Sequence, residues 1–245
     1  MIPQIVAFGR LPHDPAAFLK TRPVPYRMMM PQMGAVKRPD WQPCLGHNDV
    51  WGTCSTTGLA NAARMVEMAT GGDLDLSDDL IAEAFAAWTG TAYNDAAMRA
   101  SAGAVLLDIL NQQAAGGFNA GTPTPLVGLV GRIGTSRMLL ARAIQTFHHA
   151  YIGVDLRQRD MEQVAVWDIA AGRDDGPVAG GHCVALYDFA GLGDADTVRI
   201  ATWGTLMPAT WSWVEARIME AYALAWRQLE MPNVDFDALE EALVA

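Results

Sequence analysis

The most constraining feature of the sequence is a cysteine placed where a polar, glycine-containing turn gives way to a long run of small and apolar residues. The stretch is LGHNDVWGTCSTTGLANAA, residues 45–63, and its periodicity predicts a helix from about Thr53 to Met68. The first N–H groups of a helix are unpaired and carry partial positive charge, which favours a thiolate. Cys54 is therefore biased towards reactivity. The alternative is a small apolar residue that packs the helix, the commoner role of a cysteine without a partner.

His182 offers the partner that such a cysteine needs. It lies in GGHCVALYDF, where it follows a glycine pair and opens a short apolar run with strand character. We therefore expect its imidazole at a sheet edge and not deep in a core. In a Cys–His pair the imidazole takes the thiol proton and the imidazolium holds the thiolate, so thiol pKa values can fall to about 3–4 from about 8.5. Sequence spacing does not show that the two residues meet.

Four short stretches, taken in order, resemble the papain-like cysteine peptidases. They are GTC at residues 52–54, YIGVD at 151–155, GHCV at 181–184 and TWG at 202–204. The resemblance spans roughly residues 45–223, and its details look closer to a divergent branch found in phages and bacteria. It implies an α+β, two-lobe fold with a helical left lobe, an antiparallel β right lobe and the cleft between them. The cysteine helix would run along the interface of the lobes.

The resemblance also implies roles for individual residues. Cys54 matches the nucleophile and His182 the general base. Asn48 matches the glutamine that helps form the oxyanion hole, with a side chain one methylene shorter. Trp203 matches the tryptophan that shields the histidine contact from water, although it could also be a plain core aromatic.

One position departs from the family pattern. The asparagine that orients the histidine stands two residues before the tryptophan in the family, and Ala201 occupies that place here. Alanine cannot accept the imidazole N–H. Thr202 could substitute through its hydroxyl, and Asp168 or Asp188 could approach in space; the sequence does not decide among them.

Two main functions remain open at this stage. One is a cysteine peptidase or related thiol hydrolase that attacks an amide or ester carbonyl of a peptide or protein substrate. The other is a catalytically degraded papain-fold protein with a structural or binding role, for example a virion component that assembles with itself or with other virion proteins. Ala201 and the proline-rich N-terminus motivate the second. A third, intermediate case binds a peptide in the cleft without cutting it.

Composition narrows the choice of partners and compartment. A net charge of −10 and a pI near 4.8 argue against nucleic acid, which requires clustered Lys and Arg. No apolar run reaches the length of a membrane span and no signal peptide is evident, so we expect a cytoplasmic or virion-associated protein without a membrane partner. We expect no cofactor and no metal, because Cys44 and His47 are at most half a zinc site. Three cysteines do not form a disulfide framework.

The chain divides into three parts by composition. Residues 1–40 are rich in proline and predict an extended arm, with packing or assembly favoured over a prosegment in a cleft. Residues 41–230 form the papain-like domain and residues 231–245 a short tail. Within the domain we expect helices at about 77–88, 102–115 and 136–146, strands at about 150–156, 184–189 and 198–203, a lobe crossing at 121–134, and an aromatic helix that carries Trp211, Trp213 and Tyr222.

Overall fold

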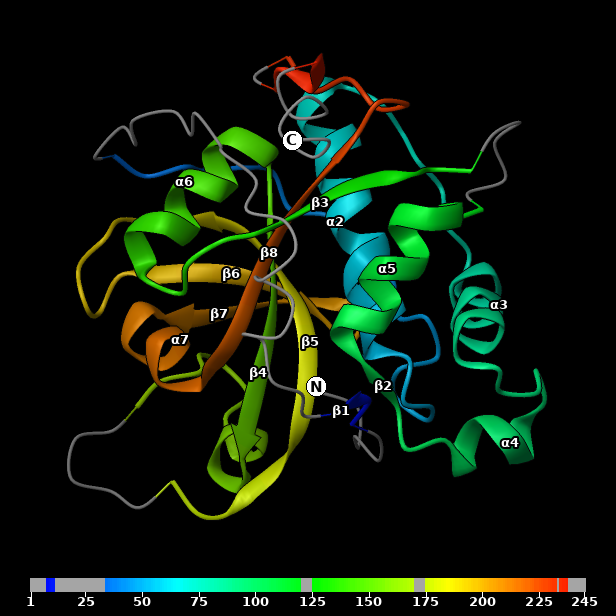
Figure 1. Cartoon of the computed structure of the whole chain (residues 1–245). Coiled ribbons are helices and arrows are strands. Elements are labelled where there is room, and N and C mark those ends of the chain that lie inside the picture. Colours follow the sequence, from blue (N-terminus) through cyan, green and yellow to red (C-terminus); the bar gives the residue numbers. More distant parts are fainter. Residues whose placement is uncertain (1–7, 12–33, 120–124, 170–174, 233, 238–245) are drawn as a thin grey trace.

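A long buried helix packs against a six-stranded antiparallel sheet at the centre of the computed structural model, which describes residues 8–11, 34–119, 125–169, 175–232 and 234–237. The helix is α2, Cys54–Thr70, and the strand order of the sheet is β3-β8-β4-β5-β6-β7. Helices α3, α4 and α5 lie on the α2 side of the sheet, and α6 and α7 lie on the other side (Figure 1). This is the α+β arrangement that the sequence predicts.

The elements are as follows. The central sheet contains β3 (Gly128–Arg132), β4 (Ala150–Arg157), β5 (Val178–Phe189), β6 (Thr197–Thr202), β7 (Thr205–Thr210) and β8 (Ile218–Trp226). The helices besides α2 are α3 (Asp78–Thr89), α4 (Asp95–Ala100), α5 (Leu106–Gly116), α6 (Arg137–Phe147) and α7 (Trp211–Arg217), with a 3-10 turn, η1, at Gln158–Glu162. A separate parallel pair joins β1 (Arg10–Leu11) to β2 (Ala104–Val105).

Small side chains allow α2 to lie close to the sheet. A Cβ at Gly58 would be 2.7 Å from the ring of Tyr151 on β4, so only glycine leaves room for that ring. The Tyr151 hydroxyl in turn donates a 2.6 Å hydrogen bond to the Ser55 carbonyl oxygen in the first turn of α2. Twelve of the 17 residues of α2 are buried, which is typical of a helix enclosed on nearly all sides. The start of α2 is thereby fixed relative to the sheet.

Several predicted elements are confirmed. Helix α2 ends at Gly71, whose φ of 88° is left-handed and favours glycine. Helix α3 begins after Ser77, whose hydroxyl accepts the Leu80 N–H at 3.3 Å. Helix α6 and strands β4, β5 and β6 also lie where the periodicity places them, although β5 starts earlier than expected.

The C-terminal part of the domain is more β-rich than predicted. The aromatic run does not form one helix: α7 ends at Arg217, and Tyr222 lies in β8. Strand β8 sits between β3 and β4 and is buried along most of its length, so its sequence shows no two-residue alternation and cannot be told from a helix by period. Strand β3 lies within the glycine-rich stretch for which the sequence predicts a lobe crossing. Strand β7 is not predicted from the sequence.

The helical lobe differs from the prediction in one place. Helix α5 starts at Leu106 and not near residue 102, because Ala104 and Val105 are extended and pair with β1. The short helix α4 before it was not expected. Among the described residues, no helix is both long and apolar enough to cross a membrane. Most of the predicted arm (residues 1–40) and tail (231–245) lies outside the described residues, so those boundaries stay predictions.

Candidate active site

Cys54 is the first residue of α2, and its side chain is fully buried. The preceding residue, Thr53, does not cap the helix: its hydroxyl donates to the Gly46 carbonyl oxygen at 2.7 Å. No N-cap side chain therefore accepts a hydrogen bond from the first N–H groups of the helix, so their partial positive charge is not reduced in this way. The thiol lies in the position that the sequence predicts for a reactive cysteine.

His182 lies on β5, directly across the lobe interface from α2. The expectation of a sheet-edge position is wrong. Strand β5 starts at Val178, four residues earlier than His182, and pairs with β4 on one side and β6 on the other. Because β5 is an inner strand covered by α2, the imidazole is fully buried.

The two residues after Ala201 hold the imidazole in place. The Thr202 hydroxyl oxygen is 2.7 Å from His182 Nε2. The indole of Trp203 stacks on the imidazole, with ring centroids 4.3 Å apart and planes 15° from parallel. Ala201 itself is buried in β6 between Ala185 and Leu206. Thr202 therefore makes the contact with the histidine nitrogen that the side chain of Ala201 cannot make.

The backbone at Trp203 is strained. Trp203 and Gly204 form the two-residue turn between β6 and β7, with φ of 44° and 70°. Glycine, asparagine and aspartate are the usual residues at positive φ in such turns, and a bulky side chain there is an outlier. The strained backbone holds the indole flat on His182. The role of Trp203 in shielding the histidine contact from water stays a prediction.

The two aspartates considered as orienting groups have other partners. Asp168 accepts the hydroxyl of Thr210 at 2.8 Å, and Asp188 forms an ion pair with Arg199. Each is thus tied to the sheet by a contact that does not involve His182.

Cys54 interacts with two side chains of β5. Burial alone would raise the pKa of the Cys54 thiol, but hydrogen bonds with Cys183 and His182 and the charge of His182 lower it well below its ordinary value. Burial and the neighbouring Cys54 thiolate raise the pKa of Cys183 well above its ordinary value. The Thr202 hydroxyl lies against His182 Nε2, whereas Nδ1 has no hydrogen-bond partner among the described residues and is the nitrogen left open for the thiol. These opposite pKa directions favour the thiolate on Cys54 and the protonated thiol on Cys183.

Asn48 is also buried. Its side-chain oxygen has no hydrogen-bond partner among the described residues, and its backbone N–H donates to the Leu45 carbonyl oxygen at 2.9 Å. The open position is an acceptor oxygen, which suits a hydrogen-bond donor, whereas an oxyanion needs the amide N–H. Its part in an oxyanion hole stays a prediction.

The N-terminal segment, residues 8–11, passes over Cys54. A Cβ at Gly9 would lie 1.9 Å from the Gly52 carbonyl oxygen and 3.0 Å from Cys54 Sγ. The Gly9 carbonyl oxygen accepts the Ala104 N–H at 2.6 Å, and Gly103, with φ of 95°, fits closely beneath Gly9. Only glycines allow this close approach of three backbones. The chain's own N-terminal segment is thus one of the elements that enclose the fully buried Cys54 thiol.

The residues considered for a metal are engaged elsewhere. The Cys44 N–H donates to Asn61, and the His47 ring nitrogen lies 2.9 Å from Asp79. Within the described ranges, no group of three or more His, Cys, Asp and Glu side chains is arranged to hold a metal ion.

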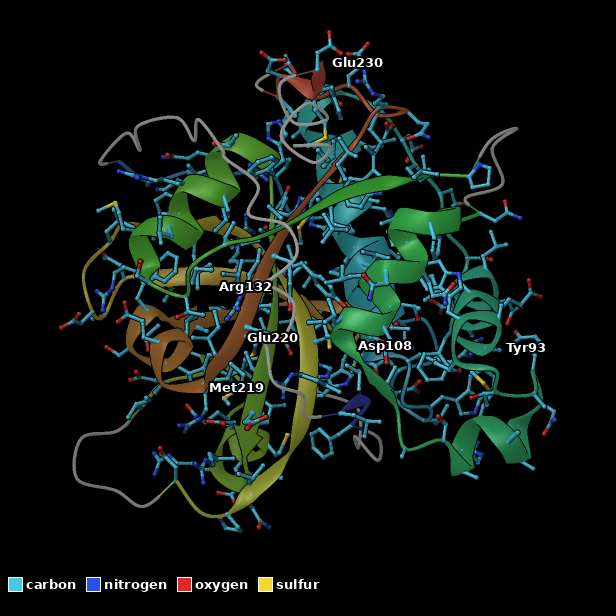
Figure 2. All side chains as sticks on the ribbon, viewed as in Figure 1. Tyr93, Asp108, Arg132, Met219, Glu220 and Glu230 are labelled. Atoms are coloured by element: carbon cyan, nitrogen blue, oxygen red, sulfur yellow. The ribbon has the colours of Figure 1, made fainter. Side chains whose placement is uncertain are left out.

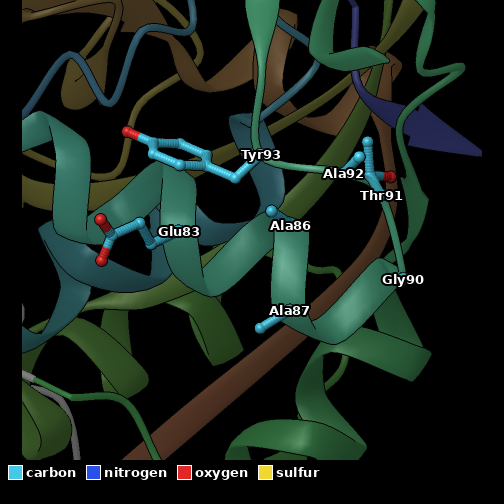
Figure 3. Close-up of a pocket in the computed structure, with 7 residues that line it drawn as sticks. All are labelled: Glu83, Ala86, Ala87, Gly90, Thr91, Ala92 and Tyr93. Carbon is cyan, nitrogen blue, oxygen red and sulfur yellow. The ribbon is translucent and has the colours of Figure 1, made fainter.

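A surface hollow at the end of α3 contains none of the predicted site residues. Figure 3 shows that its lining consists mostly of small side chains, with one carboxylate and one phenol. The lining residues are Glu83, Ala86, Ala87, Gly90, Thr91, Ala92 and Tyr93. The hollow is therefore separate from Cys54 and His182.

Two participants were missed by sequence reasoning. Cys183 was given no part in the site, although it lies directly after His182 in the sequence GHC. Residues 8–11 were included in a packing arm. The signals that could have found them are the glycine pair Gly180-Gly181 on β5 and the single glycine Gly9, but a glycine alone does not identify its neighbour.

Comparison with known proteins rests on structure. No protein-family model matches the sequence, and no curated relative was found at the sequence level. Among solved structures, xylellain, a cysteine protease from Xylella fastidiosa, is similar with a TM-score of 0.65 at 12% identity, over 89% of this chain and 95% of that one. ProCathepsin B S9 from Trypanosoma congolense has a TM-score of 0.57 at 9% identity, over 90% and 87%. Digestive procathepsin L 3 from Tenebrio molitor larval midgut has a TM-score of 0.52 at 11% identity, over 86% and 78%.

At these identities the similarity concerns the fold. Its extent along both chains includes the helical lobe that carries Cys54 and the sheet that carries His182. The chain therefore has the fold of the papain-like cysteine proteases.

Proposed function

We propose that this protein is a cysteine peptidase in which Cys54 is the nucleophile and His182 the general base. The observation that carries the proposal is the buried pair itself. The interaction with His182 lowers the pKa of the Cys54 thiol, and Thr202 holds the other imidazole nitrogen at 2.7 Å. A thiolate paired with an imidazolium is a nucleophile already formed before substrate arrives. The fold shared with cysteine proteases supports an amide carbonyl as its target.

The reaction proceeds by two acyl transfers. The Cys54 thiolate attacks the peptide carbonyl carbon, a C–S bond forms, and the carbonyl π electrons move to oxygen. The backbone N–H of Cys54 and the amide of Asn48 would donate to that oxygen. The intermediate then collapses, the C–N bond breaks, and the imidazolium of His182 gives its proton to the departing amine. Water attacks the thioester while His182 takes a proton from it, and the C–S bond breaks to return the acid and the thiolate.

Thr202 acts as a positioning residue in this scheme. If its hydroxyl accepts the Nε2–H, Nδ1 is the basic nitrogen that faces Cys54. A hydroxyl can also donate, which an asparagine carbonyl oxygen cannot, so threonine selects the productive tautomer less strictly. We expect slower turnover than an asparagine at this position would give.

A papain-fold scaffold without turnover is the alternative function. It is favoured by Ala201 and by the segment over Cys54, both of which suit a protein that no longer admits substrate. The placement within a phage and bacterial branch and a cytoplasmic or virion location stay part of this alternative. The peptidase is preferred because a scaffold has no need of a thiol with a lowered pKa.

The test is hydrolysis of fluorescein-labelled casein by the full chain carrying Arg10→Ala, which loosens the covering segment. We expect release of label that disappears when Cys54→Ala or His182→Ala is added. Cys44→Ala in the same background is the matched control, because it removes another buried thiol that lies outside the site, and it should retain activity. Hydrolysis that survives Cys54→Ala, or none in any variant, would contradict the proposal.

A further inference from the structure

The N-terminal segment carries one charged side chain, Arg10, and the structure buries it. The guanidinium Nε donates to Glu220 Oε1 at 2.8 Å, and Nη1 donates to Asp155 Oδ1 at 2.9 Å. Only 3% of the Arg10 side chain is exposed. An arginine next to the residue that covers Cys54 is thus held by two separate carboxylates inside the lobe interface.

The two carboxylates lie at different depths. Glu220 lies on β8 (Figure 2) and is fully buried. Its second oxygen accepts the Tyr222 hydroxyl at 2.9 Å. Burial and the charge of Glu220 raise the pKa of Tyr222, so this hydroxyl remains a donor. Asp155, on β4, has a side chain that is 33% exposed and stands at the rim. Burial would lower the pKa of Arg10, yet the hydrogen bond and charge of Glu220 raise it.

Two glycines provide the space for this arginine. A Cβ at Gly153 on β4 would lie 2.6 Å from Arg10 Nε and 2.9 Å from Glu220 Cγ. A Cβ at Gly181 on β5 would lie 2.5 Å from the Arg10 carbonyl oxygen. Any larger residue at either position would obstruct the side chain or the backbone of the segment. We call the site formed by Gly153, Asp155, Gly181, Glu220 and Tyr222 the arginine pocket.

The geometry of the pocket favours a guanidinium. Its two carboxylates receive hydrogen bonds from different nitrogens of one planar group, which a lysine ammonium with a single nitrogen reproduces less well. An uncharged side chain of the same shape would leave the fully buried Glu220 without the charge that Arg10 brings.

We propose that the arginine pocket is a specificity site that accepts an arginine side chain of a peptide substrate, and that residues 8–11 fill the cleft as a tethered ligand of the same site. Gly9 lies against Cys54 Sγ and Arg10 is the next residue, so a bound substrate would carry its arginine one residue from the attacked carbonyl. The cleavage itself rests on the function proposed above. The pocket is a binding property that can be tested without it.

The binding test uses the full chain carrying both Cys54→Ala and Arg10→Ala, which cannot react and leaves the pocket without its own arginine. Two fluorescein-labelled peptides are compared by anisotropy: Phe-Gly-Arg-Leu, the sequence of residues 8–11, and the same peptide with citrulline in place of arginine. Citrulline keeps the shape and removes the charge. Both peptides compete with the same tethered segment, so the ratio of their Kd values reports the pocket.

We expect the arginine peptide to bind at least about tenfold more tightly than the citrulline peptide. Adding Glu220→Gln should bring the two affinities together. Asp108→Asn, at an exposed carboxylate of α5, is the matched control and should leave the preference intact. Equal affinities for the two peptides, no binding of either, or a preference that survives Glu220→Gln would overturn the inference.

The two proposals fail in different ways. Selective binding of the arginine peptide without hydrolysis by any variant that keeps Cys54 would reject the peptidase and leave the pocket standing. Hydrolysis of casein with no preference for arginine in the binding test would reject the pocket and leave the peptidase standing.

Discussion

The molecule holds two buried arginines in nearly the same chemistry but in different structural settings. Arg10 donates to Glu220 and Asp155, and Arg217 pairs with Asp160 and Asp175, each through contacts of 2.8 or 2.9 Å. In each case one carboxylate is fully buried and the other is partly exposed. Their side chains are 3% and 5% exposed.

The difference between them is in what each one ties together. Arg217 ends α7, and its partner Asp160 also accepts the Trp213 indole N–H and the Arg157 backbone N–H. These residues belong to α7, η1 and β4, which are part of the central sheet or pack against it. Arg10 instead ties a short N-terminal segment into the cleft between the lobes. Removing Arg217 leaves a charge enclosed in the fold, whereas removing Arg10 lets the segment leave and water reach Glu220. Similar ion pairs can thus stabilise the fold at one site and hold a segment in the cleft at another.

The largest expected effect comes from Arg217→Ala. Because Asp160 cannot be reached by water without unfolding its surroundings, we expect a loss of about 3–5 kcal/mol in the free energy of unfolding, measured by urea denaturation. Arg99→Ala, which removes an exposed pair with Asp95 on α4, is the control and should cost less than about 1 kcal/mol. A loss for Arg217→Ala no larger than the control would break the comparison.

The second prediction concerns Arg10→Ala. We expect a change of about 1 kcal/mol or less in unfolding free energy, together with an increase of at least about tenfold in the rate at which iodoacetamide alkylates Cys54. Peptide mass spectrometry would separate Cys54 from Cys44, whose pKa is raised by burial and whose rate should not change. If the Arg10→Ala protein were strongly destabilised and Cys54 no more accessible, Arg10 would stabilise the fold in the same way as Arg217.

Thr202→Val sharpens the comparison, because it changes the site and leaves both arginines intact. In the Arg10→Ala background we expect kcat/KM to fall about three- to tenfold, the worth of one hydrogen bond, and the acidic limb of its pH profile to move up. Thr202→Ser should restore both, and Thr205→Val, on the exposed side of the same turn, should change neither. A fall in activity with an unchanged pH profile would mean that Thr202 only supports the packing.

The smallest effect is expected for Cys183→Ala. The Cys183 thiol lowers the pKa of Cys54 and raises that of Arg10, so it interacts with both the proposed nucleophile and the residue that fills the cleft. Removing this thiol should raise the pKa of Cys54, but only slightly, because a thiol is a weak hydrogen-bond donor. The alkylation rate of Cys54 as a function of pH gives the shift. A downward shift would show that Cys183 opposes the thiolate.

Local signals in the sequence were sufficient for most of the helical lobe. A polar turn followed by small residues predicted α2, and a serine with two aspartates after it predicted the start of α3, because both patterns act within one or two turns of chain. Strands β3, β7 and β8 could not be predicted in the same way. Their pairing partners are distant in sequence, and β8, being buried between two strands, lacks the alternation that marks a half-exposed strand.

The site was predictable in its residue types and not in its surroundings. Cys54, His182 and Trp203 were identified through the family pattern, and Thr202 was one of three candidates to replace the missing asparagine. In the structure the Thr202 hydroxyl and the Trp203 indole both contact the His182 imidazole. The covering of Cys54 by Gly9 and the arginine pocket depend on contacts between residues far apart in the sequence, such as Arg10 with Asp155, 145 residues away, and with Glu220, 210 residues away. No local pattern encodes such contacts.

The central claim is that His182 maintains a thiolate on Cys54, and the pH dependence of Cys54 alkylation by iodoacetamide tests it most directly. The measurement compares the Arg10→Ala protein with the Arg10→Ala/His182→Ala protein, so that access is equal in both. The account predicts that Cys54 of the first reacts at pH values well below the ordinary thiol pKa of about 8.5, and that the second loses this reactivity. An ordinary thiol profile in both proteins would contradict it.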